Sequence, residues 1–440
     1  MRYLSWMGLL AISACGHLLP SSAIERGEVL AREGRAVEAY EAFAEAVCEN
    51  PRDVRVATEF VEIWHQLGGV GDPAAKVSRC KVSEPVVLYI EGMRAAVAGR
   101  SRDADIALAR ALELSPPAYH AEIEYRRGLV ALNAGNVDAL SYLERAAGLA
   151  PARVDVRLAM ARVLVDGEEY AEAVAVLRGV LALDVTPEEI NKARRILGTA
   201  IDGAEPKLNP GVERTLQDIL VGLEKGTPET TALVRAQALV EEVPHPRVLK
   251  VAALVALHRG LETEAVNRLE VAAELSPLDP EPWRILGMAR HAGERANEAA
   301  AALGEAHRRD PFDVDVARVL ASTSTQTQDF QTARDTYADL TRLEPAVAEH
   351  YLLLARSERR LGRATAARRA AEAGVAISGQ SVPLLLELAS IEAQLALGAP
   401  TEDERRAARR RTEETIERLL EVAPDHPGAA AILASLEEHS

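Results

Sequence analysis

A 34-residue period of apolar and small residues runs through most of the chain. In one copy, Leu286 and Gly287 lie on the first of two expected helices, Ala299 and Leu303 lie on the second, and Pro311 closes the unit. The copies before and after it carry the matching residues Ala252, Ala253, Ala265, Leu269 and Pro277, and Leu320, Ala321, Ala333, Tyr337 and Pro345. A period of this length predicts helix–turn–helix units that stack on copies of themselves.

The sizes of these residues follow from the packing of two helices within a unit. Gly287 and Ala299 are small where the helices must approach closely, and Leu303 fills the seam between them. Pro311 cannot extend the second helix, so the helix ends there. The pattern resembles the tetratricopeptide repeat. That resemblance implies an all-α solenoid, a right-handed superhelix of helical hairpins, which binds other proteins rather than transforming them.

The rest of the chain is consistent with an all-α class. No useful length alternates between polar and apolar residues, and aromatic residues make up only 4% of the chain, so strands are not expected. We expect about ten units in an N-terminal array over residues 20–185 and a C-terminal array over residues 213–424. A capping helix is expected over residues 425–440.

Residues 186–212 interrupt the repeat register. Thr186 and Glu189 form the pattern of a capping box at a helix start, with Pro187 between them at the first helical position. Residues 203–211 contain two prolines and two glycines and predict an irregular segment. We therefore expect this stretch to be the joint between the two arrays.

The N-terminus has the pattern of an export signal. Arg2 is the only charged residue among the first 24, and residues 3–12 form an apolar run that is too short to span a bilayer but fits a signal peptide over residues 1–14. The following Ile-Ser-Ala-Cys at residues 12–15 resembles the bacterial lipobox. This resemblance implies lipidation of Cys15, a tether over residues 15–19, and an outer-membrane lipoprotein facing the periplasm. The alternative is an ordinary cleaved signal that contains a cysteine.

Two further cysteines fall late in the second helices of adjacent units, at Cys48 and Cys80. In an oxidising periplasm they could form a disulfide. The other interpretation is that they are two small buried apolar residues.

The charge balance argues against nucleic acid as a partner. The chain has a net charge of −16, which becomes −17 once Arg2 is removed with the leader. A strongly acidic surface repels the phosphate backbone.

Basic residues nevertheless recur on the first helices of the C-terminal units. In the repeat family these positions face the concave groove, so the resemblance implies a positive strip formed by Lys250, Arg284, Arg318, Arg356, Arg359 and Arg360. Such a strip would attract the carboxylates of an acidic peptide or an anionic glycan. The alternative is a set of solvated arginines or ion pairs within the repeats.

The corresponding positions of an N-terminal unit are apolar. Tyr89 and Met93 occupy them and suggest a groove for a partner helix or an extended segment. Packing of both side chains in the core is the other interpretation.

No motif indicates catalysis or a cofactor. The sequence lacks a His-Glu-x-x-His run, a Gly-x-Ser-x-Gly elbow and zinc-finger cysteine spacing. We therefore expect neither an enzyme nor a metal site. The predicted function is a lipid-anchored interaction scaffold for envelope proteins in pilus or secretin assembly, polysaccharide export or gliding motility. The alternatives are a binding module for an acidic peptide or an anionic glycan, and an accessory activator of an envelope enzyme. The oligomeric state is left open.

Overall fold

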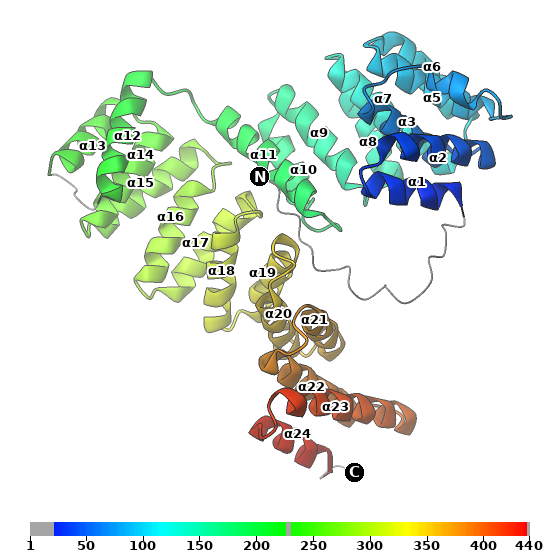
Figure 1. The fold of residues 1–440 in the computed structure, drawn as a ribbon. Coiled ribbons are helices and arrows are strands. Elements are labelled where there is room, and N and C mark those ends of the chain that lie inside the picture. The colour runs from blue at the N-terminus through cyan, green and yellow to red at the C-terminus, as the bar shows by residue number, and fades with distance from the viewer. Residues whose placement is uncertain (1–21, 226–229, 438–440) are drawn as a thin grey trace. The chain divides into compact units, whose positions relative to one another are not determined.

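The computed structural model describes residues 22–225 and 230–437, and across these ranges the backbone forms α-helices and one short 3₁₀ helix, with no strand (Figure 1). The all-α prediction is confirmed. The expected signal peptide at residues 1–14, the tether at 15–19 and Cys15 lie outside the described residues, as does the extreme C-terminus from residue 438. None of the described helices is long and apolar enough to cross a membrane.

The chain divides into two compact units, one ending at Val163 and the other beginning at Leu164. The first unit contains α1 (Ala23–Arg32), α2 (Ala36–Glu49), α3 (Val54–Gln66), α4 (Pro73–Val77), α5 (Glu84–Val97), α6 (Ser101–Leu114), the 3₁₀ helix η1 (Pro117–Tyr119), α7 (His120–Asn133) and α8 (Ala139–Leu149). The helix α9 (Val154–Asp166) contains the boundary.

The second unit contains the remaining helices. These are α10 (Tyr170–Arg178), α11 (Pro187–Ala204), α12 (Pro210–Glu224), α13 (Thr230–Glu242), α14 (Pro246–His258), α15 (Glu262–Leu275), α16 (Glu281–Ala292), α17 (Ala296–Arg309), α18 (Val314–Gln326), α19 (Phe330–Leu343), α20 (Ala348–Arg360), α21 (Ala364–Ile377), α22 (Val382–Leu397), α23 (Glu402–Val422) and α24 (Pro427–Glu437).

Consecutive helices pack as hairpins within each unit. The pairs α5–α6 and α7–α8 illustrate this in the first unit, and α14–α15, α16–α17, α18–α19, α20–α21 and α22–α23 illustrate it in the second (Figure 1). Neighbouring hairpins also contact each other, for example α17 with α18 and α19 with α20. The seam residues Leu108, Leu143 and Leu303 are completely buried. Burial of one such leucine side chain contributes roughly 1.5–3 kcal/mol, so packing between neighbours stabilises each array.

The boundary between the units differs from the joint that the sequence suggests. It falls at residues 163 and 164, and the expected joint at 186–212 belongs to the second unit. The capping box of Thr186 and Glu189 is present and starts α11. This helix packs against α10, and a Cβ atom on Gly203 would lie 2.5 Å from Cε1 of Tyr170. The packing therefore continues from α10 to α11, but α11 does not pack closely against α12, so the irregular segment between them interrupts the stack.

The hairpin of α3 and α4 is the least regular of the first unit, because its second helix has only five residues. A disulfide joins Cys48 in α2 to Cys80, which follows α4, with a Cα–Cα distance of 5.3 Å. The two cysteines are therefore paired in the structure, which is the first of the two interpretations of the sequence. The covalent link holds the segment after α4 against α2, where a full-length helix would otherwise pack.

Candidate functional site

The first helices of successive hairpins line grooves, and groove 1 lies in the first unit between α3, α5 and α7. Its volume is about 520 Å³. Its apolar lining is formed by Val61, Met93, Ala96, Val97, Leu129 and Val130. Met93 thus takes the place that the sequence assigned to it, on the wall of a mostly apolar groove.

Tyr89 does not line this groove, which corrects its interpretation as a binding residue. Its side chain is completely buried. The hydroxyl lies 2.9 Å from Oγ1 of Thr58 and donates to Oε1 of Glu122 at 3.3 Å. Burial is the main reason why the pKa of Tyr89 is raised above its ordinary value. Since hydrogen-bonding groups on both neighbouring helices satisfy the hydroxyl, the residue is part of the core.

An ion-pair network centred on Arg126 forms part of the wall of groove 1. The guanidinium of Arg126 donates to Glu122 at 2.6 Å and to Glu62, and its side chain is 12% exposed. Arg153 donates to the other oxygen of Glu122 at 2.6 Å. Burial alone would lower the pKa of Arg126, but the nearby Tyr89, Glu122 and Glu62 raise it. The network joins α3 and α7 with the start of α9, and it fixes the spacing of the helices that carry the groove.

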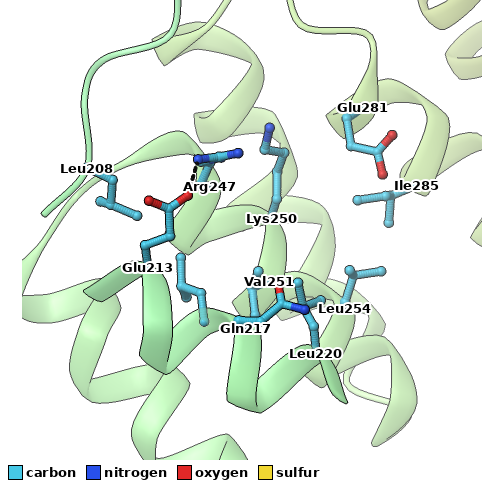
Figure 2. Close-up of a pocket in the computed structure, with 11 residues that line it drawn as sticks. Leu208, Glu213, Gln217, Leu220, Arg247, Lys250, Val251, Leu254, Glu281 and Ile285 are labelled. Atoms are coloured by element: carbon cyan, nitrogen blue, oxygen red, sulfur yellow. Dashed lines mark hydrogen bonds and ion pairs between the residues drawn. The ribbon is translucent and has the colours of Figure 1, made fainter. Parts of the chain in front are cut away.

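Groove 2 lies in the second unit and runs along α12, α14 and α16. Two adjoining cavities of about 230 Å³ and 960 Å³ share Gln217, Leu220, Leu254 and Ile285. Figure 2 shows Leu220, Val251, Leu254 and Ile285 around the smaller cavity, with charged side chains at one end. The groove therefore has an apolar floor and a charged rim.

The charged rim of groove 2 consists of paired residues. Nζ of Lys250 donates to Oε1 of Glu205 at 3.0 Å and to Oδ2 of Asp279. Burial would lower the pKa of Lys250, but Asp279 and Glu205 raise it. Arg247 donates to Glu213 at 2.8 Å, the contact drawn in Figure 2.

The prediction of a continuous positive strip is therefore corrected at Lys250, Arg284 and Arg318. Arg284 donates twice to the carboxylate of Glu281, each time at 2.6 Å, and Arg318 donates to both oxygens of Glu344 at 2.6 and 2.7 Å. Lys250 is held by two carboxylates. Each of these three 34-spaced cations has an acidic partner, because carboxylates on the same helix, on neighbouring helices or in the loops between them reach it.

The other three basic residues converge in groove 3, between α18, α20 and α22. Arg356, Arg359 and Arg360 line one cavity of about 620 Å³ together with Glu387 from α22. Nε of Arg359 donates to Oε1 of Glu387 at 2.6 Å, and Nε of Arg356 donates to its Oε2 at 3.3 Å. Here the structure brings together residues that the sequence grouped.

The sequence interpretation missed the acidic partners. Glu387 lies 31 residues after Arg356, and Asp279 lies 29 residues after Lys250, in each case slightly less than one repeat. A search for carboxylates at this spacing would have found both. Across residues 22–225 and 230–437 no group of histidine, cysteine or carboxylate side chains has the arrangement of a metal site.

Comparison with known proteins places repeats in two segments. Models of the tetratricopeptide repeat match residues 136–197 and 325–382. No curated protein matches the chain.

Several solved structures are similar to this chain at low sequence identity. YrrB, described as a TPR protein with an unusual peptide-binding site, is 14% identical and covers 45% of this chain and 97% of its own, with a TM-score of 0.35. MamA from Desulfovibrio magneticus RS-1 is 16% identical over 41% of this chain and 97% of its own, with a TM-score of 0.29. The APC/C hetero-tetramer Cut9–Hcn1 is 13% identical over 93% of this chain and 95% of its own, with a TM-score of 0.27. The family-model matches identify residues 136–197 and 325–382 of this all-α chain as tetratricopeptide repeats.

Proposed function

We propose that this chain is a non-enzymatic scaffold that holds protein partners in the grooves of its helical repeats. The observation that supports this most is groove 2, where two adjoining cavities share an apolar floor across three helices. Such a floor suits the apolar face of a partner helix or an extended segment. The ion pairs around Lys250 and Arg247 fix the rim, so binding need not order these long side chains.

The test of this proposal changes the floor of groove 2. Leu220 and Met288 line it and are half-buried, so Leu220→Glu with Met288→Glu places two carboxylates in the groove. Capture of partners from envelope membranes, read by mass spectrometry, should lose its specific partners. The matched control is Val271→Glu with Leu275→Glu, two exposed apolar residues on α15 outside the groove. Equal capture by the floor variant and the control, with unchanged helicity, contradicts the proposal.

We propose that the scaffold is attached to the bacterial outer membrane by lipid on Cys15 and faces the periplasm. The apolar leader and the Ile-Ser-Ala-Cys pattern support this assignment. Metabolic labelling with palmitate should mark the wild-type chain and leave Cys15→Ala unlabelled. Equal labelling of both would reject the attachment while leaving the groove proposal intact.

The partners that we propose are other proteins of an envelope machine, such as one for pilus or secretin assembly, polysaccharide export or gliding motility. The support is the combination of a leader with a lipobox-like cysteine and an array of repeats. The second candidate, a module for an acidic peptide or an anionic glycan, is supported only at groove 3. There, three arginines line a cavity with one glutamate, which pairs with Arg356 and Arg359.

A further inference from the structure

Groove 3 contains two arginines that are already oriented by the protein. Glu387 is only 6% exposed, and its two oxygens accept from Nε of Arg359 and Nε of Arg356. No group in the described ranges accepts a hydrogen bond from the terminal Nη atoms of either arginine. A guanidinium that is held through Nε keeps its Nη hydrogens for a second acceptor. The buried carboxylate therefore fixes two donor groups in advance, which lowers the ordering cost of binding.

Arg360 adds a third cation without an acidic partner in the part of the chain that is described. Its guanidinium carbon lies 5.8 Å from the centroid of the Phe330 ring, and the side chain is exposed. A cation over an aromatic face is held in place but keeps its charge. Glu387 is the one acidic residue in the lining of the cavity, so three positive charges face one negative charge.

Among the six cations of the expected strip, the excess positive charge lies at groove 3. Lys250, Arg284 and Arg318 on the preceding hairpins each have a carboxylate partner. Since the chain as a whole carries a net charge of −16, an anionic ligand would be repelled by most of the surface and attracted at this cavity.

The remaining lining residues favour a polypeptide over a sugar. Gln326 and Gln328 carry amides that both donate and accept, as a peptide backbone requires. Arg360 lies over the ring of Phe330, and Tyr337 is 5% exposed. Arg360 thus covers one face of Phe330 and Tyr337 is buried, which leaves little aromatic surface for stacking on a sugar ring.

We propose that groove 3 binds an acidic segment of a partner protein, with neighbouring carboxylate side chains held by Arg356, Arg359 and Arg360. This inference rests on the proposed function and names the chemistry of one partner. Each carboxylate takes hydrogen bonds from a fixed guanidinium, the arrangement that gives the strongest ionic hydrogen bonds. Arg is suited to this role because its planar fork matches the two oxygens of a carboxylate.

The test uses the full chain and a fluorescein-labelled hexaglutamate peptide, with binding followed by fluorescence anisotropy. Arg356→Gln with Arg360→Gln removes two charges and leaves the Arg359–Glu387 contact in place, so we expect affinity to fall by about tenfold or more. The matched control is Arg55→Gln with Arg308→Gln, which removes two charges from positions on α3 and α17 that are 76% and 68% exposed and line none of the three grooves. Its affinity should stay within about twofold of wild type.

Further arms separate the outcomes. Arg360→Gln alone removes an exposed side chain that forms no described ion pair, and it should weaken binding even if the double variant does not fold. Fluorescein-labelled tetragalacturonate reports on an anionic glycan. Three results would each overturn the proposal. They are an equal loss of peptide affinity in the groove variant and the control, binding of the galacturonate alone, and no binding of either probe. Partner capture through groove 2 is measured separately, so these outcomes leave the scaffold proposal standing.

Discussion

Gly287 in α16 lies directly against Leu303 in α17. A Cβ atom on Gly287 would come within 2.6 Å of Cγ and 2.7 Å of Cδ2 of that leucine. The same relationship recurs between Gly92 and Leu108 and between Gly128 and Leu143, at 2.8 and 2.6 Å. The hairpins α5–α6, α7–α8 and α16–α17 therefore close on a glycine of the first helix and a leucine of the second.

The first prediction is that Gly287→Ala destabilises the second unit. Alanine stabilises a helix interior by roughly 1 kcal/mol relative to glycine, but the added methyl group overlaps Leu303 and its backbone nitrogen. Overpacking of this kind costs about 1–3 kcal/mol, so we expect a net loss in urea unfolding. The control is Gly304→Ala in α17, where nothing lies within 4 Å. That variant should gain stability, and a gain in both would contradict the packing argument.

The turns between the helices of a hairpin supply the second prediction. Gly260, Glu294, Gln328 and Gly362 follow one another at 34-residue intervals, and all have positive φ angles, of 74°, 59°, 62° and 74°. A non-glycine residue costs roughly 1–2 kcal/mol in this conformation. Glycine relieves this strain, but part of the gain is offset because glycine has more conformational entropy in the unfolded chain. Glu294→Gly and Gln328→Gly should therefore stabilise the second unit by a few tenths to about 1 kcal/mol. Gly260→Ala should have the opposite effect, and thermal unfolding of the three variants tests the sign.

These features show what the sequence could predict. The helix pairs, the close approach at Gly287 and the capping box at Thr186 depend on residues within one hairpin, so a single period reveals them. The all-α class follows from the same local pattern.

Contacts between hairpins were harder to predict. The partner of Arg318 is Glu344, 26 residues away, while the partners of Arg356 and Lys250 lie at other spacings. Which carboxylate reaches which cation depends on how neighbouring helices cross, and the repeat pattern does not specify that crossing. Tyr89 was misplaced for the same reason, because its burial requires hydrogen-bonding groups on α3 and α7.

The third prediction concerns the link between Cys48 and Cys80. It closes a loop of about 32 residues around the shortest α-helix of the first unit, and a disulfide of this kind contributes roughly 2–4 kcal/mol. Cys48→Ala with Cys80→Ala should lower the stability of α2 to α5, measured by hydrogen exchange. Dithiothreitol should reproduce this loss in the wild type and have no further effect on the variant. Equal exchange in oxidised wild type and variant would show that the link does not stabilise the unit.

The fourth prediction is a pH dependence centred on Glu392 in α22. Its side chain is 3% exposed, and its Oε2 accepts from Oγ1 of Thr415 at 2.8 Å. Burial raises the pKa of Glu392 above its ordinary value of 4.5, although the Thr415 hydrogen bond opposes the shift. A raised pKa means that protonation favours the folded state. The stabilisation by protonated Glu392 is therefore complete below the pKa that this carboxyl has in the unfolded chain. It is lost as the pH rises through the pKa of Glu392 in the folded chain.

Glu392→Gln should consequently stabilise the second unit at pH 7, by an amount on the order of 1 kcal/mol, because the amide oxygen still accepts from Thr415 without a buried charge. The advantage should disappear below about pH 4, near the ordinary carboxyl pKa. Glu344→Gln is the control of opposite sign. Burial would raise the pKa of Glu344, but His350 and Arg318 lower it overall, so its carboxylate stabilises the fold at neutral pH and loses this effect on acidification. Urea unfolding at pH 7 and at pH 4 gives the change in the free energy of unfolding of both variants. If both variants gain or both lose stability at pH 7, Glu392 is not the buried, disfavoured charge.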